Sequence, residues 1–230
     1  MRSSNLGIKG AGDQDMTVQG ELGTGSSRAD DTATMPPPVA AVRSGVVAAA
    51  DYGRYYDLES YLLNSVQHRF ADKGYLFAFD LFCIVVWNAS ESEKAVACKL
   101  RAQGFTSLDA ASCVLTRELS QKTNGRERLR CLWGKWGFGL PLASAILSVL
   151  YPDEFALYDT RVCEALGGSR DLAELTDFEQ LWQGYLEFKQ AVEGSAPSGR
   201  TLRDKQRDLC GRHVYEQLQH DIERGFREGV

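Results

Sequence analysis

Hydrophobic and polar positions alternate with the period of an α-helix along most of the chain. One apolar face runs through residues 51–69, at Tyr55, Leu58, Leu62 and Val66. Residues three and four positions apart lie on the same side of a helix, so this spacing is typical of an amphipathic helix. The same pattern predicts helices over residues 92–103, 107–121, 125–136, 171–191 and 202–226. We therefore expect an all-α fold. The chain length of 230 residues suits one domain, or a two-lobed helical domain with one shared core.

Two further stretches are apolar on almost every side. Residues 77–88, FAFDLFCIVVWN, include the β-branched run Ile84-Val85-Val86 and could form a strand by composition. Their length and their helical neighbours favour a buried helix instead. Residues 140–150 form the second stretch, and Pro152 ends it because proline cannot continue a helix.

The composition changes near residue 50. All 4 Trp, 9 Tyr and 10 Phe residues follow Asp51, whereas the preceding segment is rich in small and polar residues and contains Pro36-Pro37-Pro38. Such a segment cannot bury enough apolar surface to offset the entropy lost on ordering. We expect a disordered low-complexity tail over residues 1–48 and one helical domain over residues 49–230.

The overall composition is that of a soluble globular protein, with 43% hydrophobic and 25% charged residues. No apolar run reaches the roughly 18 residues of a membrane-spanning helix, and the N-terminus lacks the apolar core of a signal peptide. We expect a cytoplasmic protein that does not bind membranes.

Neither the cysteines nor the histidines form a metal-binding motif. No two cysteines lie closer than 15 residues in the sequence, which excludes CxxC zinc sites and clustered iron–sulfur ligands. The three histidines, His68, His213 and His220, are equally scattered. We expect reduced, mostly buried thiols and no metal site of this kind.

Two segments are basic although the chain has a net charge of −5. Residues 117–135 carry six basic and two acidic side chains, and residues 200–212 carry five basic and two acidic side chains. These could be solvated helix faces, or they could contact nucleic-acid phosphates. The candidate DNA contacts are Arg126, Arg128, Arg130, Lys135 and Arg161.

A glycine-containing turn, residues 136–140, precedes the apolar helix. In this glycine turn, Gly137 and Gly139 flank Phe138. Glycine can adopt positive φ and allows a ligand to approach the backbone. The turn amides, with those of the following helix, could bind an anion such as a DNA phosphate, while Phe138 anchors the turn in the core. The alternative is an ordinary connection between two helices.

Asp159 follows the apolar residues Ala156-Leu157-Tyr158 and precedes the expected start of another helix. A helix N-cap would account for an aspartate at this position. A functional role is the second interpretation, because a basic helix, the glycine turn and a buried helix all precede Asp159 in the sequence.

This order of features resembles the helix-hairpin-helix DNA glycosylase superfamily, whose motif reads roughly L-P-G-V-G-x-x-x-A, then an apolar helix, then P/V-x-D-x-x-V. Gly137-Phe138-Gly139 matches the hairpin, and Ala143 matches the small helix residue. The stretch SAILSVLYPDEFALYDTRVCEAL is similar to the following helix, loop, aspartate and its helix. The close match covers about 30 residues, and a looser match extends to FDLFCIVVWNASESEKA.

The chain departs from the family pattern at two places. Lys135-Trp136 replaces the usual Leu-Pro before the first glycine, and Pro141 stands where bifunctional members carry a Schiff-base lysine. The cluster cysteines of some relatives are also absent. The resemblance therefore implies a monofunctional glycosylase, which hydrolyses the N-glycosidic bond of a flipped-out damaged or modified base and leaves an abasic site.

The resemblance also implies roles for individual residues. Asp159 would be the catalytic carboxylate, stabilising positive charge on the sugar and orienting or deprotonating the attacking water. The candidates for the DNA-backbone hairpin are Trp136, Gly137, Phe138, Gly139 and Leu140. The candidates for the base pocket or the wedge are Trp87, Asn88, Ser90 and Tyr55.

By the same resemblance, DNA is the partner of a monomeric protein, no cofactor is required, and hairpin carbonyls could hold a structural Na⁺ or K⁺. The target would be a damaged base in repair, or a modified base of viral DNA. Two other interpretations stay open: a non-catalytic DNA-binding module that uses the same hairpin, and a helical protein-interaction domain in which the glycines only form a turn.

Overall fold

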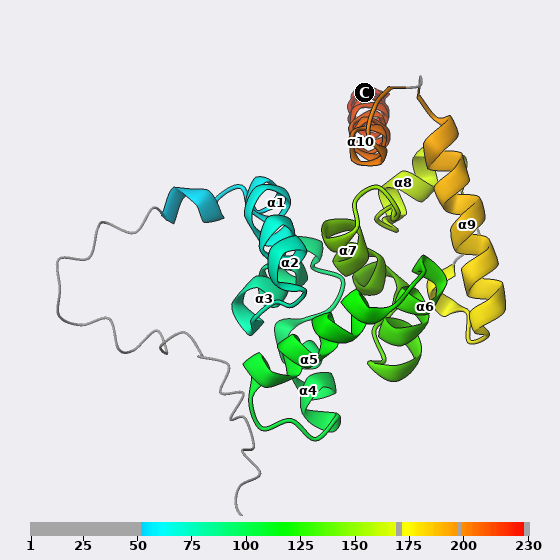
Figure 1. Cartoon of the computed structure of the whole chain (residues 1–230). Coiled ribbons are helices and arrows are strands. Elements are labelled where there is room, and N and C mark those ends of the chain that lie inside the picture. The colour runs from blue at the N-terminus through cyan, green and yellow to red at the C-terminus, as the bar shows by residue number, and fades with distance from the viewer. Residues whose placement is uncertain (1–51, 169–171, 197–198, 228–230) are drawn as a thin grey trace, which may run out of the picture. The chain divides into compact units, whose positions relative to one another are not determined.

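In a computed structural model the chain is described over residues 52–168, 172–196 and 199–227, with side chains up to Gly225. These residues form helices joined by turns, with no strand among them (Figure 1). The predicted all-α fold is therefore confirmed. The tail expected over residues 1–48 lies outside the described residues. Within the described ranges, no helix is both long enough and apolar enough to cross a bilayer.

The first helical segment begins later than its apolar pattern suggests. A 3₁₀ turn, η2 (Tyr52–Tyr55), precedes α1 (Leu58–Tyr61), the π-helical turn η3 (Leu62–Val66) and α2 (Gln67–Lys73). The Asp57 side chain accepts a hydrogen bond from the Ser60 amide at 3.1 Å, so it caps α1 and fixes its start. Gly74, at φ 72°, ends α2.

The ambiguous apolar stretch is a helix, α3 (Ala78–Asn88), as expected. It is followed by α4 (Glu93–Ala102) and α5 (Leu108–Gln121), whose N-caps are Ser92 and Ser107. Each of these serines accepts a hydrogen bond from the amide three residues later. These caps account for the agreement between the predicted and observed bounds of both helices, because the apolar period and the cap residue coincide.

The next helix runs through α6 (Gly125–Arg130) and ends as the π-helical turn η4 (Cys131–Lys135). The glycine turn leads into α7 (Leu140–Leu150), in which every residue except Pro141 is buried. α7 packs against α2, α3 and α6, and Figure 1 shows it between the group α1–α3 and α9. Its small residues, Ala143 and Ala145, are fully buried at these contacts.

The C-terminal part contains α8 (Thr160–Ala165), the 3₁₀ turn η5 (Leu172–Glu174), α9 (Phe178–Gly194) and α10 (Leu202–Arg227). The helix expected over residues 171–191 begins only at Phe178, because Asp177 caps it by accepting a hydrogen bond from the Gln180 amide at 2.9 Å. The first part of α10 lies against α8 and α9. This packing brings α10 next to the segment that carries Asp159.

A partly buried ion pair joins the N-terminal helices. Asp80 on α3 accepts hydrogen bonds from Arg69 Nε at 2.9 Å and Arg69 Nη2 at 2.7 Å, and from the Tyr61 hydroxyl at 3.1 Å. A two-point contact between guanidinium and carboxylate fixes the orientation of both groups. This polar cluster therefore links α1, α2 and α3.

Candidate active site

The segment before α8 has no regular structure, and side chains from distant helices satisfy its backbone. The Tyr185 hydroxyl on α9 accepts from the Ala156 amide at 3.0 Å and donates to its carbonyl at 2.7 Å. Gln206 on α10 does the same for Leu157, accepting at 3.0 Å and donating at 2.6 Å. Because buried backbone groups need partners, these contacts fix the chain just ahead of Asp159.

Asp159 is the N-cap of α8. Its Oδ1 accepts a hydrogen bond from the Arg161 amide at 2.8 Å, so the cap interpretation of the sequence is confirmed. The Arg161 side chain also binds the carboxylate at both oxygens, at 3.1 Å from Nε and 2.9 Å from Nη2. Burial raises the pKa of the Asp159 carboxyl, but the hydrogen bonds and charge of Arg161 outweigh this and hold that pKa below its usual value.

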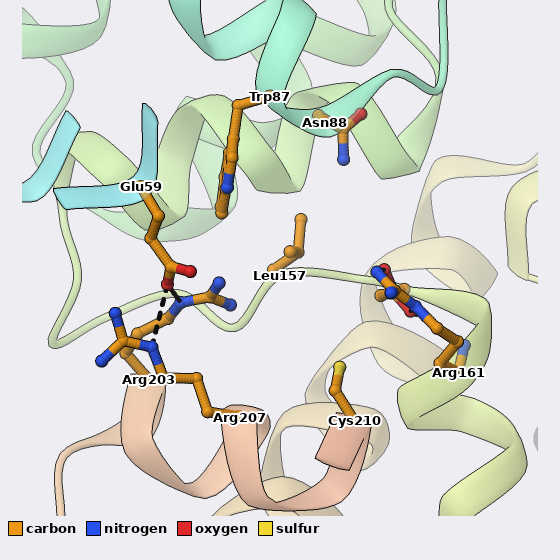
Figure 2. A pocket seen from close by; sticks show the side chains of 9 residues that line it. Glu59, Trp87, Asn88, Leu157, Arg161, Arg203, Arg207 and Cys210 are labelled. Carbon is orange, nitrogen blue, oxygen red and sulfur yellow. Dashed lines mark hydrogen bonds and ion pairs between the residues drawn. The ribbon is translucent and has the colours of Figure 1, made fainter. Parts of the chain in front are cut away.

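Asp159 and Arg161 line a cavity of about 250 Å³ between α1, the end of α3, the segment before α8 and α10 (Figure 2). The volume lies below the range usual for drug-sized ligands. The polar residues on its wall are Glu59, Asn88, Asp159, Arg161, Arg203 and Arg207. The rest of the wall is formed by Trp87, Leu157 and Cys210.

Trp87 and Asn88, two of the residues predicted from the sequence, reach this cavity from the last turn of α3. Ala89, at φ 54°, ends that helix. Ser90 is exposed, donates a hydrogen bond to Asn88 Oδ1 and does not line the cavity. Tyr55 lies elsewhere, in a separate apolar hollow between η2 and α3. Two of the four base-pocket candidates therefore share the cavity with Asp159.

The other side of the cavity is built by residues that the sequence did not single out. Glu59 on α1 accepts hydrogen bonds at a single oxygen, Oε1, from Arg203 Nε at 2.5 Å and Arg207 Nε at 3.1 Å. The Arg203 guanidinium also lies 5.1 Å from the Trp87 ring centroid. Arg203 and Arg207 stand four residues apart in the basic segment 200–212, which was the only sequence signal for them.

Cys210 contributes a neutral thiol to the cavity wall. Burial raises the pKa of this thiol, and the negative charge of Asp159 raises it further. Because the thiolate is the nucleophilic form of cysteine, Cys210 is poorly suited to attack a substrate at neutral pH.

In the glycine turn, Trp136 and Phe138 are each only 1% exposed, and Leu140 is fully buried. Phe138 therefore anchors the turn in the core, as predicted. Gly137 is exposed at φ 69°, a conformation that favours glycine. The amide of Gly139 donates to Glu91 Oε1 at 3.0 Å, so a carboxylate of the chain itself lies where an anion was expected.

The other backbone amides of the turn differ in whether they donate a hydrogen bond. The Trp136 and Phe138 amides donate to the Cys131 and Leu132 carbonyls. No hydrogen bond among the described residues engages the amides of Gly137 and Leu140.

Two carbonyls of the turn region, where the resemblance implied a Na⁺ or K⁺, already accept hydrogen bonds. The Lys135 carbonyl accepts a hydrogen bond from Gln103 Nε2 at 3.0 Å, and the Gly139 carbonyl accepts one from the Ala143 amide.

The expected DNA-contacting cations largely face acidic partners. Three ion pairs join Arg126 to Glu179, Arg128 to Glu154 and Lys135 to Glu118. Arg130 is exposed, with its guanidinium 5.0 Å from the Phe178 ring centroid. The local positive charge counted along the sequence is therefore partly neutralised in the fold.

Among the described residues, no cluster of three or more His, Cys, Asp or Glu side chains has a metal-binding arrangement. No protein-family model matches the chain, and neither a curated protein nor a solved structure matches it.

Proposed function

We propose that the protein is a monofunctional DNA glycosylase that hydrolyses the N-glycosidic bond of an extruded base. The observation that supports this proposal best is the meeting of Trp87, Asn88 and Asp159 at one cavity. About 70 residues separate the first two from the third, and all three were candidates on the sequence alone. A cavity with a flat aromatic wall and a carboxylate suits a base that has rotated out of the duplex.

In this proposal Asp159 faces the deoxyribose. As the bond between C1′ and the base nitrogen breaks, the base leaves with the bonding electrons and positive charge develops on the sugar. A carboxylate held next to that charge stabilises it. Water then adds to C1′, and the proton that it loses neutralises the departed base at the nitrogen that held the bond, yielding an abasic site and the free, neutral base. Arg161 must release at least one Asp159 oxygen for this contact, and its 57% exposed side chain has room to move.

The absence of a Schiff-base step rests on two features. Pro141 stands at the position of the family lysine, in the first turn of α7, where proline is well tolerated. In addition, lysine does not occur among the described residues that line the cavity. We therefore infer that water is the nucleophile, so the DNA strand stays intact after base release.

The glycine turn would hold the DNA backbone through the amides of Gly137 and Leu140. The Gly139 amide becomes available only if Glu91 swings away, which Lys99 opposes through its ion pair with Glu91 Oε2 at 2.6 Å. We propose a monomeric cytoplasmic protein that needs no organic cofactor. Its target is a damaged base or a modified base of viral DNA.

The test is a survey of duplex DNAs that carry single lesions or viral base modifications. We expect abasic sites on at least one DNA, strand breaks only after alkali, and no protein–DNA adduct on borohydride reduction. Strand cleavage without alkali, together with a trapped adduct, would contradict the monofunctional mechanism. Absence of base release from every DNA would contradict the enzyme assignment.

One observation favours a second candidate, a non-catalytic DNA-binding module. Arg161 and the α8 cap engage both oxygens of Asp159, which is the arrangement expected of a structural aspartate. Such a module would bind DNA with steep salt dependence and release no base. A helical protein-interaction domain, the third candidate, would not bind DNA even at low salt.

A further inference from the structure

The ion pair between Glu59 and Arg203 uses only some of the hydrogen-bonding atoms of the two side chains. Both arginines that bind Glu59 use Nε, and both bonds end on Oε1. Within the described residues, no hydrogen bond engages Glu59 Oε2 or the two Nη atoms of Arg203. The Glu59 and Arg203 side chains are only 22% and 17% exposed, respectively. A half-buried acceptor thus stands beside a half-buried pair of donors.

These atoms face the interior of the cavity. Figure 2 shows the Glu59 carboxylate and the Arg203 guanidinium on one side of the cavity and Arg161 on the opposite side. Asp159 is hydrogen-bonded to Arg161 and lies with it. A base whose sugar sits near Asp159 would therefore extend its far edge toward Glu59 and Arg203.

An acceptor next to a donor pair is complementary to a lactam edge, in which a ring carbonyl adjoins a ring N–H. The carboxylate accepts from the N–H, and the guanidinium donates to the carbonyl oxygen. Three arginines and two carboxylates line the cavity, so its net charge is positive when all five are ionised. A positive cavity disfavours a cationic base.

We propose, building on the proposed function, that Glu59 and Arg203 read the edge of the extruded base and select neutral lactam bases over cationic N-alkylated purines. Hypoxanthine, uracil and 8-oxoguanine belong to the favoured class. Ethenoadenine is neutral but lacks a lactam edge, whereas 7-methylguanine and 3-methyladenine in DNA are cationic. Arg207 holds Glu59 in place, and Trp87 provides the flat wall.

The experiment measures single-turnover release of each base from otherwise identical duplexes by the wild-type protein and by Glu59→Gln and Arg203→Lys. Glutamine keeps an oxygen that can accept from the arginines, but its amide can place a donor at the second position. Lysine keeps the charge and loses the two-pronged donor. Glu216→Gln and Arg212→Lys, two substitutions on α10 outside the cavity wall, are the matched controls.

We expect the wild type to release a lactam base at least tenfold faster than ethenoadenine or the methylated purines. Each cavity variant should lower that ratio by about tenfold to a hundredfold, the discrimination expected from one two-point contact. The controls should leave it unchanged. The ratio of two rates does not depend on the fraction of folded protein, so a purely structural ion pair would not move it.

Preferential release of ethenoadenine or methylated purines would overturn this inference while supporting the glycosylase. An unchanged ratio in both cavity variants would overturn it in the same way. If the wild-type protein bound these DNAs but released no base from any of them, the proposed function and this inference would both be overturned.

Discussion

Asp159 makes more contacts than a helix cap needs. One oxygen accepting from the Arg161 amide is sufficient to cap α8, yet the Arg161 guanidinium binds both oxygens. The pair stays in contact with the cavity, where the Asp159 side chain is 17% exposed. Arg161 therefore lowers the pKa of this carboxyl and covers both of its oxygens.

The charge of Arg161 gives a pH test of this residue. Arg161→Gln removes the side-chain hydrogen bonds and the charge that lower the pKa of Asp159 and leaves the backbone amides in place, so that pKa should rise. In the proposed mechanism base release needs the ionised carboxylate, so the acidic limb of the pH–rate profile should move to higher pH in the variant. The pH profile of single-turnover release measures this shift, with Arg200→Gln as a control for loss of an exposed arginine. An acidic limb at the same pH would contradict the role of Arg161.

The same lowered pKa affects stability. A carboxyl with a depressed folded-state pKa contributes stability that is complete above its unfolded pKa. That contribution is lost as the pH falls through the folded pKa. Asp159 therefore stabilises the fold at neutral pH and ceases to do so only in acid.

Two glycines of the turn should respond differently to alanine. Gly137 has φ 69°, where an added side chain costs about 1–2 kcal/mol, although nothing lies near the new Cβ. Gly139 has φ −62°, and its Cβ would make ordinary contacts, 3.6 Å from Glu91 Oε1 and 3.7 Å from Pro141 Cδ. Chemical denaturation should show a loss of about 1 kcal/mol for Gly137→Ala and a change within about 0.5 kcal/mol for Gly139→Ala. Equal losses would contradict the turn geometry.

At the scale of elements, helix α10 supports the site through a buried side chain. Gln206 pairs with both backbone groups of Leu157, two residues before Asp159. Gln206→Leu leaves a buried amide and carbonyl without partners, so the free energy of unfolding should fall by about 2–4 kcal/mol. Gln217→Leu, an exposed position on the same helix, is the matched control in denaturant melts. Equal stability of the two variants would show that Gln206 does not hold this segment.

Glu91, which lies just before the N-cap of α4, contacts the glycine turn, and this contact predicts an effect of Glu91 on DNA binding. Glu91 places a negative charge at the Gly139 amide, close to the proposed phosphate site. Glu91→Gln should therefore tighten DNA binding by about two- to fivefold, the strength of an anion's interaction with a helix N-terminus. Fluorescence anisotropy at constant salt measures this affinity, with Glu93→Gln as the control. Unchanged or weaker binding would indicate that the turn does not hold the backbone.

At the scale of the whole molecule, the sequence predicted those helix bounds that are determined by nearby residues. The helical period and the caps Ser92 and Ser107 defined α4 and α5 closely, because both signals act within a few residues. The late start of α9 was missed, since the apolar spacing at Leu172 and Leu175 continues across a 3₁₀ turn and the cap Asp177.

The candidate site was predictable only in part, because some of its residues are brought together by the packing of helices that lie far apart in the sequence. Trp87, Asn88 and Asp159 were singled out because the segments that carry them resemble a family motif. Glu59 and Arg203 are 144 residues apart, and no spacing rule links them. Their pairing follows from the packing of α1, α3, α8 and α10 around one cavity. For the same reason, charge counted along the sequence overstated the cationic surface, because the acidic partners come from other helices.

The central claim is that the Asp159 carboxylate takes part in base release, and one pair of variants tests it most directly. Asparagine caps helices about as well as aspartate, so Asp159→Asn keeps the start of α8 and removes the charge. Asp177→Asn makes the same change at the cap of α9, outside the cavity wall. On a DNA that the wild type processes, we predict at least about 100-fold slower single-turnover release for Asp159→Asn, with DNA binding retained, and an unchanged rate for Asp177→Asn. Equal rates for the two variants would contradict the claim.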